Sequence, residues 1–476
     1  MTGISHLLWS GYWTSGHTKS FSFPVTNADY VTGIYKAYDV RGIYPEQLDE
    51  KIARDIGAAF GTIFSGNIVV GHDVRLSSLS LEDSVIEGLL SAGNTVVDIG
   101  MVCTPMVPFS INELGYDSGM MVTASHNPPE YNGFKFFSGG GIPVSYESGI
   151  GEIEKLVERR TFKTGRGKFV RKNITALYRK FIARNFDVEK NKHNISISID
   201  AANGPAGPIY RRILKTFVKT EGLYCKPDGR FPGHEPDPTK PSNLRDLQAK
   251  VRECKTGVGF AYDGDGDRLA VVDEKGGMLD TTTVFAMLIK DALERRPGAR
   301  VVHDVLCSKF IDDIILKYGG VPVECRVGHT FISHKMLDVK AVIGGELSGH
   351  YYFAETHGAD DALFATMRLI EILTKEKETL SEISKNFRSN YLSYQERFTI
   401  ADDKKFKFVD ALKEELARKY EMVAIDGVKI IFDRGWAAIR ASNTEPKISV
   451  VYEASDRKAF DEIGEVVKGI LENIPK

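Results

Sequence analysis

One stretch of the chain combines several residue types that could do chemistry, and a serine lies within it. Residues 123–135 read TASHNPPEYNGFK and place Ser125 on a short polar turn directly after an apolar run, residues 119–122. Two prolines prevent that run from continuing as a helix, so the turn should present the serine. A serine attacks only when a neighbour activates it, and His126 and Lys135 offer a base and a cation. A simple Asn-Pro turn with a capping serine would explain the same residues without chemistry.

Three aspartates at alternate positions form a second candidate site. Asp263, Asp265 and Asp267 stand in the stretch DGDGDR, and the glycines between them let the backbone fold tightly. Three carboxylates can then converge on one hard cation, for which Mg²⁺ is the expected ion. A serine, a magnesium-type site and the adjacent Arg268 together describe phosphoryl transfer better than acyl transfer, because acyl transfer needs no metal.

An EF-hand calcium loop is the rival interpretation of these aspartates, because Glu274 falls at its twelfth position. That loop requires glycine at its sixth position, where Arg268 stands, and a helix on each side. The flanking residues 258–262 and 269–272 read as strands instead. The pattern therefore favours a metal loop between two strands.

Both stretches resemble the phosphoserine loop and the metal loop of the α-D-phosphohexomutases, most closely the phosphomannomutase/phosphoglucomutase branch. Two further family motifs follow in the same order, GELSGH at residues 345–350 and RASNTEP at residues 440–446. The resemblance runs from about Tyr35 to the C-terminus. It implies reversible transfer of phosphate between O1 and O6 of glucose or mannose, through phosphoserine and a hexose 1,6-bisphosphate that serves as intermediate and activator. It also implies that Mg²⁺ is held by the three aspartates and an oxygen on phospho-Ser125.

The resemblance implies a catalytic set and a substrate-binding set of residues. Arg41 resembles the family arginine that lines the cleft beside the nucleophile, and His329 resembles the histidine proposed to assist proton transfer. Lys135 is the other candidate for that transfer, since a lone histidine more often makes a structural hydrogen bond. The catalytic set comprises Ser125, Lys135, His329, Arg41, His126 and Arg268. The substrate-binding set comprises Tyr38, Glu346, Ser348, His350, Arg440, Ser442, Asn443 and Thr444.

The last two motifs also have a chemical rationale of their own. Glu346 and Ser348 lie on a glycine-flanked loop and offer an acceptor and a donor for neighbouring sugar hydroxyls. Arg440 can grip a phosphate, while residues 442–444 supply further donors. A surface turn and a helix cap are the alternatives that involve no ligand.

Two positions depart from the family pattern. Relatives usually carry a lysine where Leu306 stands and an arginine where Ser449 stands. The lysine is associated with ligand contacts, so another side chain such as Lys309 must replace it or recognition is weaker.

Two rival functions remain beside the hexose mutase. Phosphoglucosamine mutases usually carry glutamine at the position of Leu347 and Ser-Gly-Thr at residues 442–444, so both positions favour neutral hexoses. A non-catalytic phosphosugar-binding protein would have lost the serine or a metal ligand. The sequence leaves the choice between glucose and mannose open.

Length and composition limit the remaining possibilities. With 476 residues the chain is too long for one core, and 42% hydrophobic and 26% charged residues are typical of a globular protein. A net charge of −2 argues against general binding of nucleic acid or of an acidic membrane surface. The five cysteines form no CxxC pair, and we find no bilayer-spanning run or secretory signal. We therefore expect a cytoplasmic enzyme whose partner is a phosphosugar, with its oligomeric state open.

A strand-helix-strand unit repeats along the chain. Asp73, Asp200 and Asp304 each stand where an apolar strand gives way to a helical stretch. These aspartates are expected to have structural roles, as caps. After about residue 390 the pattern changes to hairpin strands with turns at residues 426–427 and 434–435, preceded by a helix and closed by another.

We therefore predict an α/β protein with three similar mixed α/β domains and an α+β C-terminal domain on an antiparallel sheet, arranged around a central cleft. The predicted segments are a leader at 1–32, domain I at 33–173 with the phosphoserine loop, domain II at 174–275 with the metal loop, domain III at 276–390 with the sugar loop, and domain IV at 391–476 with the phosphate-binding loop. A site built from four domains can surround its ligand and exclude water.

Overall fold

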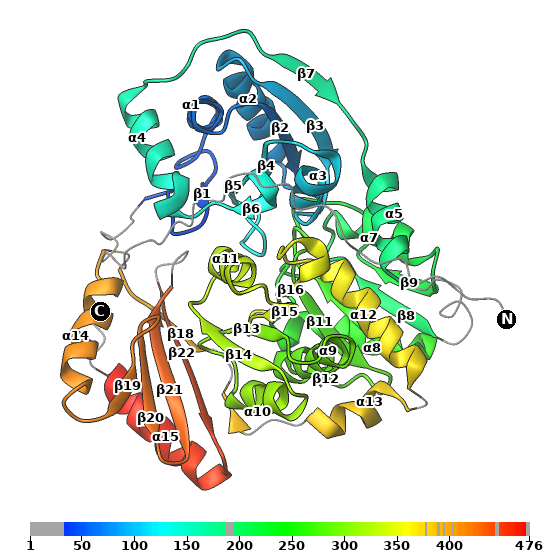
Figure 1. The fold of residues 1–476 in the computed structure, drawn as a ribbon, viewed down its shortest axis with the longest axis vertical. Helices are drawn as coiled ribbons and strands as arrows, with labels where there is room; N and C mark the ends of the chain where they lie inside the picture. The colour runs from blue at the N-terminus through cyan, green and yellow to red at the C-terminus, as the bar shows by residue number, and fades with distance from the viewer. Residues whose placement is uncertain are drawn as a thin grey trace, which may run out of the picture.

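The computed structural model describes residues 33–186, 195–376, 378–387, 391–393, 396–401, 403–442 and 447–472. The predicted leader, residues 1–32, and the predicted ligand residues Asn443 and Thr444 lie outside these ranges. Figure 1 shows four groups of strands and helices that follow one another around a common centre, from blue at the top through green and yellow to orange and red. The predicted fold class is confirmed. We call the four groups regions I to IV.

Region I, residues 33–171, is built on a mixed sheet with the strand order β1-β5-β4-β2-β3-β7 and with β6 beside β5. Its strands are β1 (Val40–Ile43), β2 (Asn67–His72), β3 (Thr95–Met101), β4 (Ser118–Val122), β5 (Tyr131–Ser138), β6 (Ile142–Pro143) and β7 (Lys168–Arg171). Its helices are α1 (Glu50–Ile63), α2 (Ser78–Ser91), α3 (Met106–Leu114) and α4 (Gly151–Arg159). β2 pairs with β3 and β4 in parallel, whereas β5 runs antiparallel to β4 and β1.

Region II, residues 175–279, contains a sheet with the order β12-β11-β10-β8-β9. Its strands are β8 (Ser196–Asp200), β9 (Lys219–Leu223), β10 (Val258–Tyr262), β11 (Leu269–Asp273) and β12 (Met278–Leu279). Its helices are α5 (Thr175–Asn185), α7 (Ala206–Leu214) and α8 (Arg245–Cys254). Because β12 pairs with β11, this sheet extends a few residues past the predicted boundary at 275.

Region III, residues 281–387, contains a sheet with the order β14-β13-β15-β16. Its strands are β13 (Arg300–Asp304), β14 (Val321–Cys325), β15 (Ile343–Gly345) and β16 (Tyr351–Phe353). Its helices are α9 (Thr281–Arg295), α10 (Lys309–Lys317), α11 (His329–Val339), α12 (Ala362–Lys375) and α13 (Leu380–Ile383).

Region IV, residues 391–472, contains an antiparallel sheet with the order β17-β22-β21-β20-β19 and with β18 beside β22. Its strands are β17 (Tyr391–Leu392), β18 (Glu396–Thr399), β19 (Glu421–Val423), β20 (Val428–Phe432), β21 (Gly435–Ala441) and β22 (Lys447–Ala454). Its helices, α14 (Lys405–Leu416) and α15 (Arg457–Leu471), correspond to the two that the sequence predicts. Asp456 caps α15 by accepting a hydrogen bond from the amide of Ala459.

The predicted repeat is present as β2-α2-β3, β8-α7-β9 and β13-α10-β14, and the two strands of each unit are parallel. Asp73, Asp200 and Asp304 at the ends of the first strands accept hydrogen bonds from backbone amides two residues further on. They order the turn after the strand, while the helices begin several residues later. The aspartates are structural, as expected, but they do not act as helix caps.

The candidate loops occupy equivalent places in regions I to III. Each follows a parallel strand and leads into an antiparallel one: residues 123–130 join β4 to β5, residues 263–268 join β10 to β11, and residues 346–350 join β15 to β16. One large core of buried side chains runs through these three regions, region I has a second core of its own, and region IV has a separate core. Among the helices in the described ranges, none has the length and apolar character needed to cross a membrane.

Candidate active site

The turn between β4 and β5 presents Ser125 with an unusual backbone conformation. Ser125 has a φ of 50°, in the left-handed region, and only 2% of the residue is exposed. Its amide donates to Oγ1 of Thr123 at 2.8 Å, and its own Oγ lies 3.2 Å from Nδ1 of His126. A strained conformation at a buried hydroxyl is typical of a functional turn.

The carbonyl groups of this turn are held by Arg75, a residue that the sequence does not mark as functional. The buried guanidinium of Arg75 donates to the carbonyl oxygens of Ser125, Asn127, Pro128 and Tyr131 at 2.6 to 2.9 Å. The carboxylate of Asp73 orients this guanidinium, with Nε of Arg75 3.2 Å from Oδ2. Arg75 therefore determines the shape of the turn without facing a ligand.

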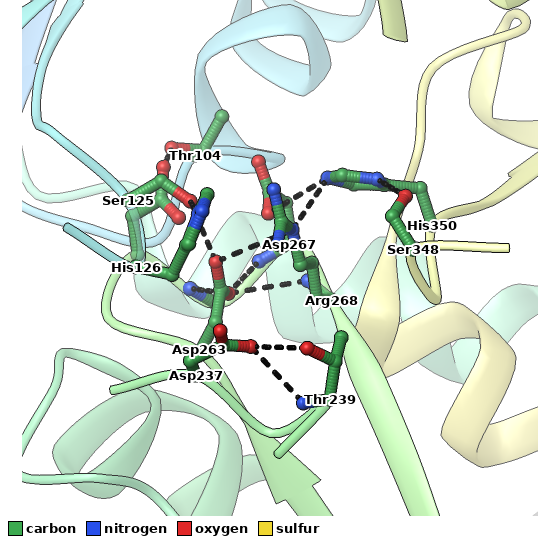
Figure 2. A network of polar contacts seen from close by, with 12 residues as sticks. Thr104, Ser125, His126, Asp237, Thr239, Asp263, Asp267, Arg268, Ser348 and His350 are labelled. Carbon is green, nitrogen blue, oxygen red and sulfur yellow. Dashed lines mark hydrogen bonds and ion pairs between the residues drawn. The ribbon is translucent and has the colours of Figure 1, made fainter. Parts of the chain in front are cut away.

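The metal loop closes on its first aspartate. Oδ1 of Asp263 accepts hydrogen bonds from the amides of Gly266, Asp267 and Arg268 at 3.0 to 3.2 Å. Its other oxygen, Oδ2, accepts a hydrogen bond from Oγ of Ser125 at 2.8 Å, which Figure 2 shows near the centre of the network. Two motifs far apart in the sequence therefore meet at one pair of oxygen atoms.

A glycine permits this close approach of regions I and II. A Cβ atom at Gly264 would lie 2.4 Å from the carbonyl oxygen of Ser125, too close for any other residue type. Thr104 joins the same two regions by donating from its amide to the carbonyl of Asp265 at 2.9 Å and from its hydroxyl to Oδ2 at 2.6 Å. No sequence motif marks Thr104 as a functional residue.

The three aspartates fit a divalent cation. Their ligand oxygens lie within 4.8 Å of one another and all three residues are buried. Within the described part of the chain, no group donates a hydrogen bond to Oδ1 of Asp265, and Oδ1 of Asp267 has only the ion pair with Nε2 of His350, at 3.3 Å. A buried carboxylate oxygen without a hydrogen bond is costly unless a cation compensates it, so this donor set suits Mg²⁺.

Lys135 bonds to the other carboxylate oxygen of both Asp265 and Asp267. Its Nζ lies 2.8 Å from Oδ2 of Asp265 and 2.5 Å from Oδ2 of Asp267. Burial lowers the pKa of Lys135, but the two carboxylates outweigh burial and raise it, so the side chain stays an ammonium ion. For Asp263, burial and then the carboxylates of Asp267 and Asp265 raise the pKa well above its usual value. A cation is therefore needed to keep all three carboxylates ionised.

His126 and Arg41 flank the serine. Burial, followed by the charges of Arg268 and Arg41, lowers the pKa of His126 well below its usual value, so the ring is neutral. Arg41 donates to Oδ1 of Asn127 at 2.9 Å and to Oδ2 of Asp39 at 2.6 Å. Both predicted residues therefore lie beside Ser125.

His329 begins α11 and stacks edge-on against Tyr38 of region I, with ring centroids 4.9 Å apart. Burial and then the charge of Lys135 lower the pKa of His329 to about 3. Burial and then Asp39 raise the pKa of Tyr38 to about 12. Both rings are therefore uncharged near neutral pH, at the junction of regions I and III.

The loop between β15 and β16 is linked to the metal loop through His350. Nε2 of His350 lies 3.3 Å from Oδ1 of Asp267, and Nδ1 lies 3.1 Å from Oε2 of Glu346 and 2.7 Å from Oγ of Ser348. Burial lowers the pKa of His350, but Asp267 and Glu346 outweigh it and raise the pKa to about 10. Figure 2 shows His350 and Ser348 together at the edge of the network, beside Asp267 and Arg268.

Arg440 lies at the end of β21 and is 5% exposed. Its Nε lies 3.2 Å from Oδ2 of Asp426, which also accepts a hydrogen bond from the amide of Val327 in region III. Nη2 of Arg440 is buried and has no hydrogen-bond partner among the described residues. Ser442 follows directly after β21. Ser442 aside, every described residue of the predicted catalytic and substrate-binding sets lies in contact with this site or within close electrostatic range of it.

Comparison with known proteins gives a family for this arrangement. The profiles described as phosphoglucomutase/phosphomannomutase, alpha/beta/alpha domains I, II and III, match residues 33–164, 176–277 and 280–391, and the C-terminal domain profile matches residues 397–469. A phosphomannomutase/phosphoglucomutase of Pseudomonas aeruginosa is 34% identical over 93% of this chain and 96% of its own length. The chain belongs to the phosphoglucomutase/phosphomannomutase family. A phosphoglucomutase of Neisseria gonorrhoeae is 35% identical over 94% of this chain and 98% of its own length.

A solved structure of this family has the same fold. The phosphoglucomutase/phosphomannomutase family protein of Burkholderia thailandensis aligns with a TM-score of 0.84 and 32% sequence identity. The alignment covers 93% of this chain and 99% of that one. The predicted resemblance to phosphohexomutases is therefore confirmed.

The two departures from the phosphohexomutase pattern have different structural settings. Leu306 is buried in an apolar cluster with Trp436, Ala438 and Val451, where regions III and IV meet. A lysine there would place its charge among apolar side chains unless it reached past them. Lys309 begins α10, where its amide donates to Oε2 of Glu453 at 2.9 Å, and its side chain is exposed. Ser449 is 3% exposed and lies in the middle of the region IV sheet.

Proposed function

We propose that this protein is a phosphohexomutase that moves phosphate reversibly between O1 and O6 of glucose or mannose through a phosphoserine at Ser125. The contact between Oγ of Ser125 and Oδ2 of Asp263 at 2.8 Å carries the proposal. It joins a hydroxyl in a strained turn to a buried carboxylate triad, which is the combination that metal-assisted phosphoryl transfer requires. The names of the relatives support the same activity.

In the proposed cycle, phospho-Ser125 donates its phosphoryl group to the free hydroxyl of a hexose monophosphate and forms a hexose 1,6-bisphosphate. After the sugar reorients, Ser125 takes up the other phosphoryl group and the product leaves. Asp263, Asp265 and Asp267 would hold Mg²⁺ together with a phosphate oxygen on Ser125. A bound Mg²⁺ supplies charge neutralisation for the transferring group. Lys135 and Arg268 add fixed positive charge beside the same carboxylates.

Proton transfer at the sugar hydroxyl is proposed for Lys135 and His329. His329 is neutral, since its pKa is lowered to about 3, and can accept a hydrogen bond from a hydroxyl. Lys135 is charged and can donate to the leaving oxygen. Glu346, Ser348 and His350 are proposed to hold the sugar hydroxyls, because their loop lies against the metal loop through Asp267.

The phosphate that is not reacting is proposed to bind Arg440 and residues 442–444. The buried Nη2 of Arg440, which no described residue bonds, supports this assignment. We also propose a cytoplasmic location. All five cysteines lie in the described ranges as free thiols, which suits a reducing compartment.

A coupled assay with glucose 1-phosphate, mannose 1-phosphate and glucosamine 1-phosphate, each with Mg²⁺ and its hexose 1,6-bisphosphate, tests the function. Turnover of glucose 1-phosphate or mannose 1-phosphate is expected. Turnover restricted to glucosamine 1-phosphate would favour the rival mutase. Binding of all three without turnover by a preparation phosphorylated on Ser125 would contradict a catalytic role.

A further inference from the structure

The sheet of region IV has two faces with different surroundings. Ala437, Ile439 and Val450 belong to the core of region IV, together with residues of α14 and α15. Trp436, Ala438 and Val451 form the opposite face and pack against Leu306 of region III. Because side chains alternate along a strand, Arg440 lies on the second face, which we call the inner face.

The pairing register places Arg397 on the same inner face. Ser449 of β22 is opposite Arg440 of β21 on one side and opposite Arg397 of β18 on the other. Residues directly opposite each other in an antiparallel pair point to the same side of the sheet. The neighbours of Arg397 obey the same alternation, because Phe398 packs on the outer core.

The small side chain of Ser449 separates two arginines. Since β18 and β21 lie on either side of β22, the Cα atoms of Arg397 and Arg440 are about 10 Å apart, twice the spacing of neighbouring strands. A larger side chain at the central position would fill the space between the two guanidinium groups. With serine there, both can reach one anion, and the serine hydroxyl adds a donor.

The charges of both arginines act toward region I. The positive charge of Arg397 helps to lower the pKa of His126, after burial, Arg268 and Arg41. The charge of Arg440 opposes the rise that burial and Asp39 cause in the pKa of Tyr38. Both arginines therefore lie within electrostatic range of the residues beside Ser125.

We propose that Arg397 is a further phosphate-binding residue, which acts with Arg440 across Ser449 as a two-arginine clamp for the phosphate that is not reacting. Nη2 of Arg440, buried and bonded by no residue in the described ranges, marks the place of the anion. Two guanidinium groups match a phosphate dianion in charge and in donor geometry. The inference rests on the proposed function and explains how the chain manages with serine, not arginine, at position 449.

Arg397→Ala is the first test, with glucose 1-phosphate and glucose 6-phosphate as substrates. Loss of one charge-assisted contact should raise KM about tenfold or more for both, because either phosphate must occupy the clamp in turn. Arg397 is exposed, so its truncation leaves no buried cavity. In a Ser125→Ala background, which cannot turn over, calorimetry should show a matching rise in the Kd of glucose 1-phosphate.

Three further variants make the test specific. Arg434→Ala removes an exposed arginine from the turn at the other end of the sheet, where it pairs with Asp456 and Glu462, and should leave KM unchanged. Arg397→Lys keeps the charge but loses the fork, so its KM should lie between those of the wild type and Arg397→Ala. Adding Ser449→Arg to Arg397→Ala returns a guanidinium to the inner face and should recover part of the lost affinity.

The outcomes separate the two proposals. If the wild type turns over no hexose phosphate, the proposed function fails. If the wild type is active but Arg397→Ala has unchanged KM and Kd, only the clamp is overturned. An equal rise in KM for Arg434→Ala would likewise overturn the clamp, because it would show a general effect of net charge.

Discussion

The buried carboxylates of the metal loop in region II are held by side chains of region I. In region IV, by contrast, two arginines lie on the same face of one sheet. Ser125, Thr104 and Lys135 of region I bond directly to the aspartates of region II. One core runs through regions I to III and so includes both regions that make these contacts, while region IV has a separate core. Reacting atoms need fixed positions, whereas the proposed phosphate clamp would have to accept either end of the sugar.

The contact of region IV with region III shows the same difference. Glu453 accepts hydrogen bonds from the hydroxyl of Ser308 at 2.5 Å and from Nε1 of Trp436 at 2.6 Å. The small apolar cluster that includes Leu306 also joins the two regions, as does the ion pair between Lys429 and Glu324. This junction orients the inner face without merging the two cores. We therefore expect substitutions at the contacts between regions I and II to abolish turnover. Substitutions on the inner face of region IV should instead weaken substrate binding.

The largest effect is expected from Ser125→Ala. Removal of the proposed nucleophile should reduce kcat on the order of 10⁴-fold or more, because the proposed cycle passes the phosphoryl group through Oγ of Ser125. Intact-mass analysis should show the loss of one phosphoryl group relative to the wild type. Ser84→Ala, in α2, should change neither quantity. An active Ser125→Ala enzyme would disprove the phosphoserine.

Asp265→Asn tests the metal loop. Loss of one of three carboxylates should weaken Mg²⁺ binding and lower kcat about a hundredfold or more. Titration with Mn²⁺ followed by electron paramagnetic resonance measures the metal affinity independently of turnover. Asp313→Asn, on the exposed side of α10, is the matched control. Unchanged Mn²⁺ affinity in Asp265→Asn would remove this aspartate from the ligand set.

Arg440→Ala tests the binding side and should have a smaller effect. Losing a charged hydrogen-bonding group should cost about 2 kcal/mol in kcat/KM, and remote binding energy of this kind contributes to kcat as well as to KM. The defect should appear in both reaction directions, measured with 1-phospho and 6-phospho substrates. A defect in one direction alone, beyond what the equilibrium explains, would show that the two orientations do not share this pocket.

The smallest effect on activity is expected from Glu82→Gln, because Glu82 lies in α2 and belongs to neither predicted set of site residues. Burial and then the carboxylates of Asp98 and Asp83 raise the pKa of Glu82 from 4.5 to about 9. Between these pH values the folded protein holds a proton that the unfolded chain releases, so the free energy of unfolding falls as pH rises. Glu82→Gln removes this ionisation and should raise Tm at pH 8 more than at pH 5, with kcat/KM unchanged.

A steeper fall of Tm with pH in Glu82→Gln than in the wild type would contradict the buried carboxyl. The measurement also sharpens the comparison with the metal loop, because Glu82 is a buried carboxyl with no ammonium ion bonded to it among the described residues. Oε2 of Glu82 lies 3.6 Å from Nε2 of His72, and the nearby Arg171 pairs through Nε with Asp98. Asp265 and Asp267, by contrast, have the ammonium of Lys135 between them.

The sequence predicts the serine turn, the metal loop and the three strand-helix-strand units, because each depends on residues that are close together in the chain. Alternate aspartates with glycines between them indicate a tight loop wherever it lies, and the apolar strands around it follow from local pattern. The resemblance to a family adds the roles of residues such as His329 and Glu346. The assigned roles and the domain boundaries stay predictions.

The sequence gives little sign of Arg75, Thr104 or Arg397. Arg75 follows a strand end and looks like an exposed arginine, yet it bonds to four carbonyl groups of a turn some 50 positions away. Thr104 has no motif of its own, and Arg397 is one cation in an ordinary strand. Their partners are distant in sequence, so no local pattern can identify them.

The residue types that can do chemistry, and the elements that carry them, were therefore determined by the sequence itself. Only the tertiary structure decided that Oγ of Ser125 meets Asp263, that Leu306 packs on region IV, and that Ser449 lies between two arginines. The physical reason is that local pattern depends on backbone geometry over a few residues. Contacts between regions and the register of β18 on β22 depend instead on how whole surfaces pack.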